Sequence, residues 1–309
     1  MSHLYLGIEI GGTKLQLILG TCSGEILERQ RLDVEPSRGG AGIREQIQTA
    51  LPTLIRGRVI TGTAVGFGGP VDFKTGNIAC SHQIEGWSEF PLGSWLENQM
   101  QGPVCVENDA NTAALGEALA GAGQGQNPVF YITLGSGVGG GLVVDGQIYH
   151  GRVPGEAEVG HLRLDREGTV VESRCSGWAV DARIRSAALK EPESILAKLA
   201  AGMVKGEARH LRTALDQEDA LAHRLLEEIA EDLAFGLSHV VHLYHPEVIV
   251  LGGGLSLVGE PLRGAVEKAL KGFVMEAFAP GPRVVLAALT EDAVPMGALL
   301  LAAKNSSRS

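Results

Sequence analysis

Two glycine-rich turns, each between short apolar runs, have residue types that can bind phosphate. The first is Gly11–Lys14 and the second is Gly135–Gly137. Because glycine has no Cβ, backbone amides at such a turn can approach phosphate oxygens, and Thr, Ser and Lys side chains add donors. Neither turn fits the Walker pattern or the GxGxxG pattern that opens a helix. Each turn alone is more typical of a tight hairpin.

A second group of polar residues, Glu107–Asn111, lies where a predicted strand meets a predicted helix. Short polar side chains are favoured as helix N-caps and the helix dipole favours an acidic residue there, so Asn108 or Asp109 has a structural explanation as a cap. Further along, Glu158 and His161 stand three positions apart. A histidine near a single acid is more often structural than functional, so none of these residues identifies a site by itself.

The elements that carry these residues repeat along the chain. The first part predicts strands at 4–10, 15–19, 25–34, 61–67 and 104–107, and helices near 41–56, 91–101 and 109–120. Strands at 129–134, 140–144 and 147–149 then repeat the opening meander, with IEIGGTKLQLIL aligned on ITLGSGVGGGLVV. A period of about 120 residues is too long for a solenoid and indicates two related α/β domains facing each other across a cleft. The two glycine turns occupy equivalent points of the repeat, which favours phosphate loops over plain hairpins.

The remainder is mostly helical from about 176 to 244, followed by a strand at 247–251, a helix near 259–277, a strand at 283–288 and a helix near 294–304. The helix over 220–244 has apolar residues at helical spacing, which is typical of core or of a dimer surface. His239, His242 and His245 recur every third residue, but no Cys or acid accompanies them at ligand spacing, so a metal site there is disfavoured.

The composition is that of an ordinary globular protein. The 309 residues are 44% hydrophobic and 20% charged, with a net charge of −10, so extended disorder, nucleic-acid binding and attachment to an anionic membrane are all disfavoured. The four cysteines form no zinc pattern. The first residues enter a strand pattern without a basic segment, and no apolar run reaches roughly 18 residues, so we expect a cytoplasmic protein.

These motifs resemble those of the ROK family of bacterial sugar kinases and repressors, within the actin, Hsp70 and hexokinase superfamily. The family's phosphate loops, IDxGGTK and LGTGVGGG, correspond to Ile8–Lys14 and Leu134–Gly141, and Val250–Gly254 resembles its adenosine loop. The resemblance implies an α/β fold of two duplicated actin-like (ribonuclease H-like) ATPase domains with an interdomain cleft. The ATP-binding residues that it implies are Gly11, Gly12, Thr13, Lys14, Gly135, Ser136, Gly137, Gly252, Gly253 and Gly254.

The same resemblance implies a sugar site. The family's ENDAN motif corresponds to Glu107–Asn111, which makes Asn108 a ligand of sugar hydroxyls and Asp109 the general base that deprotonates the attacking hydroxyl. Its GAGEIGH segment places Glu158 and His161 on the sugar, and a later family Glu corresponds to Glu172. The remaining residue implied in this site is Gly69, within a shortened form of the family's GxGxPGxVD segment.

The sequence departs from the family at two points that concern metals. Most members have a CxCGxxGCLE run after the histidine that binds zinc, but residues 162–171, between His161 and Glu172, contain no Cys. We therefore expect no structural zinc, and we expect His161 to serve the sugar alone. Glu9 stands where the family has the Asp that helps to hold Mg²⁺ through water.

The resemblance predicts an ATP- and Mg²⁺-dependent hexose kinase that phosphorylates the 6-hydroxyl, with glucose preferred and a fructose, mannose or N-acetylhexosamine kinase as the alternative. A non-catalytic sugar-sensing protein is the alternative of another class. A repressor would need a DNA-binding domain ahead of the first phosphate loop, which here begins at residue 11. The sequence leaves open whether polyphosphate replaces ATP.

The predicted small N-terminal domain covers 1–113 and regains 294–309, and the large C-terminal domain covers 114–293. A homodimer is expected, with a sugar and ATP as the other partners and no nucleic acid or membrane.

Overall fold

The computed structural model describes residues 3–81, 84–100, 102–153, 155 and 157–307. The chain divides into two compact units. The first comprises Met1–Gly125, Gly141–Glu156 and Glu291–Ser309, and the second comprises Gln126–Gly140 and Ala157–Thr290. The domain boundaries expected from the sequence stay a prediction.

The first unit contains a five-stranded sheet of order β3-β2-β1-β4-β7. Its strands are β1 (Leu4–Ile10), β2 (Lys14–Gly20), β3 (Ile26–Asp33), β4 (Ile60–Phe67) and β7 (Val104–Asn108). The first three form an antiparallel meander, and β4 and β7 add to it in parallel. In β1, Leu6, Ile8 and Ile10 join one buried cluster while Tyr5 joins another, because successive side chains point to opposite faces of a strand. Both faces of the sheet are therefore covered.

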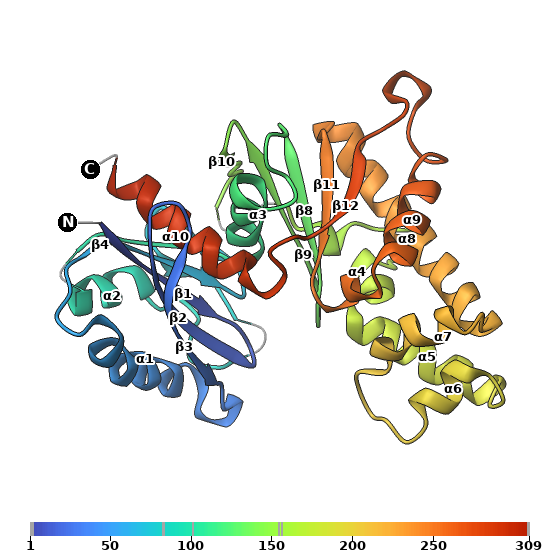
Figure 1. Cartoon of the computed structure of the whole chain (residues 1–309), viewed down its shortest axis with the longest axis horizontal. Coiled ribbons are helices and arrows are strands. Elements are labelled where there is room, and N and C mark those ends of the chain that lie inside the picture. The colour runs from blue at the N-terminus through green and yellow to red at the C-terminus, as the bar shows by residue number, and fades with distance from the viewer. Residues whose placement is uncertain (1–2, 82–83, 101, 154, 156, 308–309) are drawn as a thin grey trace. The chain divides into compact units, whose positions relative to one another are not determined.

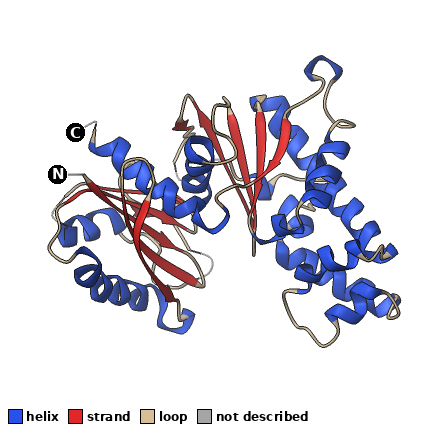
Figure 2. Cartoon of the chain, in the orientation of Figure 1, coloured by secondary structure: helices blue, strands red, loops and turns tan. Residues whose placement is uncertain are grey.

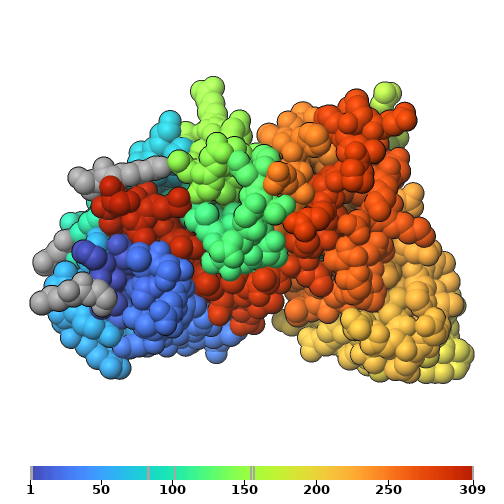
Figure 3. Space-filling model, turned by 45° about the horizontal axis from the view of Figure 1, so that its top comes forward, coloured from blue at the N-terminus to red at the C-terminus, as the bar shows by residue number. Residues whose placement is uncertain are grey.

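Helices from distant parts of the sequence cover these faces (Figure 1). They are α1 (Gly39–Ile55), α2 (Leu92–Met100), α3 (Asp109–Ala120) and α10 (Ala293–Ser306), and a small hairpin pairs β5 (Val71–Asp72) with β6 (Asn77–Ile78). Helix α10 packs on β1, β4 and α3, and Figure 3 shows residues near the C-terminus (dark red) against those near the N-terminus (blue).

The second sheet repeats the order of the first, as β10-β9-β8-β11-β12. Its strands, drawn in red in Figure 2, are β8 (Val129–Leu134), β9 (Val138–Val144), β10 (Gln147–Ile148), β11 (Val248–Gly252) and β12 (Arg283–Leu286). Again an antiparallel meander is extended by two parallel strands. The duplication expected from the sequence is confirmed.

The rest of the second unit is mostly helical. Its helices are α4 (Val171–Cys175), α5 (Gly177–Lys190), α6 (Ile195–Ala200), α7 (Leu211–Asp216), α8 (Ala220–Tyr244) and α9 (Glu260–Leu270). The apolar stripe of α8 is buried, as expected of core. Among the described residues, no helix has both the length and the apolar character needed to span a bilayer.

One predicted helix end was wrong, and one short helix was not predicted. Helix α9 ends at Leu270 rather than near 277, because the amides of Gly272 and Phe273 bond to carbonyls only three residues back, which tightens the last turn and stops the helix. The short helix α4 was not expected, because five residues are too few to give a helical period.

The packing of α3 on α10 requires glycine at two facing positions. A Cβ on Gly297 would lie 1.9 Å from the carbonyl oxygen of Thr112, and one on Gly116 would lie 2.4 Å from that of Ala293. We expect Gly297→Ala to lower the free energy of unfolding by about 2–3 kcal/mol, since overpacking forces the backbones apart.

Chemical denaturation measures this change, with Gly264→Ala in α9 as the control. A Cβ there would meet its nearest atom at 3.7 Å, so we expect that variant to gain about 0.5–1 kcal/mol. A loss at Gly297 below about 1 kcal/mol would contradict the close packing of α3 and α10.

Candidate active site

Asn108 ends β7 and caps helix α3. Its backbone is extended, and its side-chain Oδ1 accepts hydrogen bonds from the amides of Ala110 (2.9 Å) and Asn111 (3.2 Å). Its Nδ2 donates to the carbonyl of Gly69 at 3.1 Å. The capping explanation is therefore correct for Asn108, and the same side chain ties the predicted sugar residue Gly69 to the start of α3.

Asp109 is the first residue of α3, where the helix dipole stabilises a carboxylate. Its Oδ1 accepts from the amide of Ala110 at 2.8 Å. Its Oδ2 lies against the adjoining strand end, since a Cβ on Gly68 would be 3.4 Å from Oδ2 and 3.7 Å from the Cα of Gly11. The predicted base thus lies beside the first glycine turn, within one unit.

The first glycine turn is a tight connection between β1 and β2. The amide of Gly11 donates to the carbonyl of Lys14 at 2.9 Å, and the carbonyl of Thr13 accepts from Val34 at 3.1 Å. Within the described part of the chain, the amides of Gly12 and Thr13 have no hydrogen-bond partner. Two backbone donors are therefore available for an anion at this turn.

Glu9 lies one strand position before this turn. Its Oε1 pairs with the Lys14 ammonium at 3.0 Å, and its Oε2 accepts from Nε2 of buried Gln16 at 2.7 Å. Over the described residues, no group of three or more His, Cys, Asp or Glu side chains could hold a metal. A lone carboxylate still fits Mg²⁺, because this ion commonly takes one or two carboxylates and completes its shell with water and phosphate oxygens.

Glu107 organises the strand-to-helix junction. Its carboxylate is nearly buried, with 6% of the side chain exposed. Oε1 accepts from the amide of Asn108 (2.9 Å) and Nδ2 of Asn111 (3.1 Å), and Oε2 lies 2.6 Å from Nε2 of His150. The His150 ring stacks on Phe73 with centroids 3.7 Å apart. His150 could not be identified from the sequence, because nothing in its spacing links it to Glu107.

In the second unit, Glu172 lies on the second glycine turn. Its Oε2 accepts from the amide of Val138 at 2.8 Å, and a Cβ on Gly137 would lie 2.6 Å from that oxygen. The carbonyl of Gly135 accepts from the amide of Gly177 at 2.7 Å. Hydrogen bonds with α4 and with the start of α5 therefore stabilise this turn, while the side chain of Ser136 is exposed.

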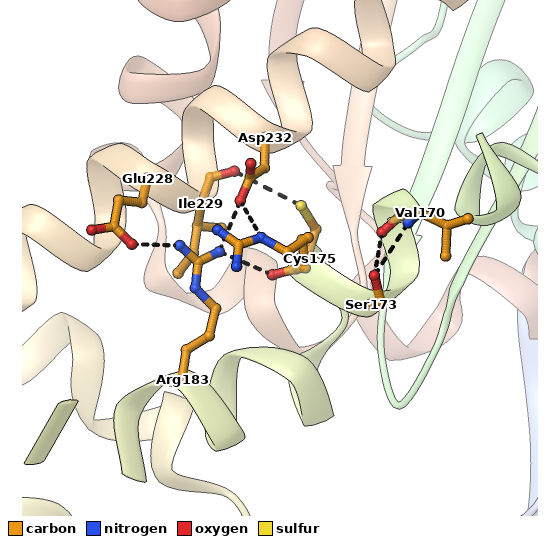
Figure 4. A network of polar contacts seen from close by, with 8 residues as sticks. Val170, Ser173, Cys175, Arg183, Glu228, Ile229 and Asp232 are labelled. Atoms are coloured by element: carbon orange, nitrogen blue, oxygen red, sulfur yellow. Dashed lines mark hydrogen bonds and ion pairs between the residues drawn. The ribbon is translucent and has the colours of Figure 1, made fainter. Parts of the chain in front are cut away.

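Helix α4, which carries Glu172, is anchored on α8 by charged residues (Figure 4). Asp232 accepts from Arg174 at 2.9 Å and from Arg183 at 3.0 Å, and Arg183 also pairs with Glu228 at 2.7 Å. Beside them Cys175 is fully buried, and this burial raises the pKa of its thiol to about 12. Cys175 is thus a neutral, small packing residue.

Glu158 precedes a short 3-10 turn and His161 is its last residue, and both side chains are exposed. A Cβ on Gly160 would lie 2.2 Å from the carbonyl oxygen of Val138, so this segment runs against the start of β9, beside the second glycine turn. The second unit thus places Glu158, His161 and Glu172 around one turn.

A small hairpin occupies residues 163–170, where most family members are expected to bind zinc. Arg163 forms a β-bridge with Val170, and the amide of Leu164 donates to Thr169 at 2.8 Å. Hydrogen bonds from Thr169 lower the pKa of Asp165, which closes the turn. The hairpin is held by hydrogen bonds between its own residues.

The third glycine run has two packing residues and one open residue. Gly253 has φ +78°, and a Cβ on it would lie 2.5 Å from the amide of Leu134. A Cβ on Gly252 would lie 2.2 Å from the hydroxyl of Tyr131, whereas one on Gly254 would meet nothing within 4 Å. Close packing on β8 therefore explains the first two glycines, and only Gly254 offers open space.

The predicted residues form two groups. The first unit holds Glu9, Gly11, Gly12, Thr13, Lys14, Gly69, Asn108 and Asp109, and the second holds Gly135, Ser136, Gly137, Glu158, His161, Glu172, Gly252, Gly253 and Gly254.

The motifs and the duplicated sheets agree with the comparison with known families, in which the ROK family model matches residues 5–305. The chain belongs to the ROK family. A glucokinase from Halalkalibacterium halodurans is 33% identical over 95% of this chain and 93% of its own length.

Solved structures agree on the fold of this ROK protein. A ROK family glucokinase from Streptomyces griseus, in complex with glucose and AMPPNP, superposes with a TM-score of 0.83 and 32% identity, covering 97% of this chain and 99% of its own. A ROK family transcriptional regulator, a homolog of the E. coli MLC protein, gives 0.87 at 21% identity, covering 99% of this chain and 78% of its own. The predicted α/β fold of this family is confirmed.

The pairing of Glu107 with His150 generates a stability prediction. We expect His150→Leu to lower the free energy of unfolding by about 2–3 kcal/mol, because it leaves a buried carboxylate oxygen without its donor. Denaturant titration at neutral pH measures the loss.

His223→Leu is the matched control, since His223 pairs with Glu218 at 3.4 Å on the surface, with 48% and 90% of the side chains exposed. Exposed pairs contribute about 0–1 kcal/mol, so equal losses in the two variants would show that Glu107 needs no partner.

Proposed function

We propose that this ROK protein is an ATP-dependent hexose kinase that phosphorylates the 6-hydroxyl of a sugar, with glucose preferred. The observation that carries the proposal is the position of Asp109, whose carboxylate lies beside the glycine turn with two available amides. A base next to an anion-binding turn suits transfer of a phosphoryl group to a hydroxyl. The similarity to glucokinases over almost the whole chain supports the same reaction.

In the proposed reaction, Asp109 orients the sugar hydroxyl and accepts its proton as the oxygen attacks the γ-phosphorus. Phosphoryl transfer depends mainly on positioning and on stabilising charge at the phosphate oxygens. The amides of Gly12 and Thr13 and the ammonium of Lys14 supply that stabilisation from the first unit. Asn108 holds the start of α3, and the second hydrogen of its Nδ2 can donate to a sugar hydroxyl.

Magnesium, when bound, would neutralise the negative charge that builds up on the phosphates. Glu9 would hold it through water, as expected from the sequence. Lys14 and Gln16 keep the Glu9 carboxylate fixed at the base of the turn, which compensates for a side chain one methylene longer than Asp.

The preference for glucose rests on the hydroxyl partners of the second unit. Glu158 and His161 are exposed and have no side-chain hydrogen bond within the described residues, and Glu172 uses only Oε2. These side chains suit the 1-, 2- and 3-hydroxyls of a pyranose, while Asn108 and Asp109 suit the 4- and 6-hydroxyls. A site built to hydrogen-bond hydroxyls discriminates strongly against analogues that leave its polar groups unpaired.

The competing functions are a kinase for another hexose, use of polyphosphate as donor, and a non-catalytic sugar sensor. The fold shared with a transcriptional regulator keeps the sensor as the candidate from another class. The homodimer and the cytoplasmic location stay predictions from the sequence.

The role of Asp109 is tested by Asp109→Asn. We expect kcat to fall by at least about 100-fold while sugar binding and the folded state are kept, because the amide preserves the shape but cannot accept the proton. ADP release measures kcat and calorimetry measures sugar binding.

The matched control is Asp216→Asn, which changes an exposed carboxylate in α7 and should leave kcat unaltered. Near-normal kcat in Asp109→Asn would reduce Asp109 to a residue that only stabilises the helix.

The sugar preference is tested with a panel of glucose, mannose, fructose, N-acetylglucosamine and N-acetylmannosamine, with ATP and Mg²⁺. We expect the highest kcat/KM for glucose, because three hydrogen-bonding side chains face its 1-, 2- and 3-hydroxyl side in the proposed site. A kcat/KM for an acetamido sugar tenfold higher than that for glucose would refute the preference for glucose but not the kinase activity. Sugar binding without ADP release from any sugar would favour the sensor.

A further inference from the structure

A cavity in the first unit contains none of the residues proposed to bind sugar or ATP. Its volume is about 260 Å³, and its walls come from β7, α3, α10, the β10 region and the loop after β5. The polar and aromatic side chains that line it are Phe73, Glu107, Gln147, His150, Lys304 and Asn305. Pockets for drug-sized ligands span roughly 300–1,000 Å³, so this cavity suits a smaller metabolite.

The uncompensated charge in this cavity is positive. Lys304 is partly buried, and its ammonium has no ion pair or hydrogen bond within the described residues. The negative charge in this cavity is on Glu107, and its carboxylate already forms hydrogen bonds with the backbone amide of Asn108, the side chain of Asn111 and the ring of His150. Burial raises the pKa of the Cys105 thiol to about 12, so this lining residue adds no charge.

A second cation lies near the cavity. Nζ of exposed Lys74 is 5.8 Å from the ring centroid of Phe73, which forms part of the wall. The amides of Gln147 and Asn305 each have donor and acceptor atoms that suit hydroxyl groups. Apolar side chains of β7, α3, β10 and α10 complete the wall.

We propose that this cavity binds a small hydroxylated anion, a sugar acid or a sugar phosphate, with its acidic group at the Lys304 ammonium. A ligand there lies against His150, which holds the Glu107 carboxylate, and Glu107 in turn holds the amide of Asn108 at the start of α3. Occupation of the cavity therefore restrains the turn that carries Asp109. Binding does not depend on the proposed kinase function, but any effect on catalysis rests on it.

Isothermal titration calorimetry of the full chain with D-gluconate and with glucose 6-phosphate tests the two kinds of anion. The glucose 6-phosphate titration includes saturating glucose, because this compound is also the product at the proposed active site. We expect at least one of the two to bind, and we expect Lys304→Met to weaken its binding at least tenfold. Lys190→Met, an exposed lysine at the end of α5, is the control and should bind as the wild type does.

A second variant keeps the Lys304 ammonium but fills the cavity. Leu301→Phe should abolish binding by filling the cavity, and thermal unfolding shows whether each variant is folded. If Lys304→Met does not fold, Lys304→Gln replaces it. Hydrogen exchange locates the ligand, with slower exchange expected over 104–111 and 298–306 in the wild type only.

Binding of neither compound to the wild type, or equal binding to the Lys304 variant, would overturn the proposal. Anion binding by a protein without kinase activity would refute the proposed function but support the anion site. Kinase activity without anion binding would support the proposed function and refute the anion site.

Discussion

The buried carboxylate of Glu107 holds together the part of the first unit on which the rest of the candidate site depends. Three donors from three segments converge on it: a backbone amide at the end of β7, a side-chain amide from the first turn of α3, and the ring of His150. A buried charge of this kind is costly unless it is fully hydrogen-bonded. This requirement fixes the strand end, the helix start and the segment after β10 in one arrangement, and that arrangement sets the position of Asp109.

The two glycine turns occupy equivalent places in the duplicated sheets but differ physically. The first leaves the amides of Gly12 and Thr13 available and keeps a charged pair, Glu9 and Lys14, at its base. The second is held from outside by Glu172 and Gly177. Duplication has therefore kept the backbone path of the turn while the groups that surround it have diverged.

Local patterns were enough to predict most strands and helices, because apolar alternation and capping act over short distances. The strand 129–134 and the helix 109–120 have the expected bounds, and the repeat was visible from aligned glycine turns. The contact between His150 and Glu107, and that between Glu172 and Val138, could not be predicted. Each contact joins residues far apart in the sequence through tertiary packing, and the local pattern of apolar and polar residues carries no information about such contacts.

Helix α10 packs against β1 and β4, although it follows the whole second unit in the sequence. Its residues Ala298, Leu299 and Ala302 complete the buried cluster around Tyr5, Ile18 and Ala64. During translation, the first sheet therefore leaves the ribosome with one apolar face uncovered, and that face stays exposed until the second unit has been made. Completion of the first unit in the cell therefore waits for synthesis of the second unit, and it depends on whatever shields the open face during that time.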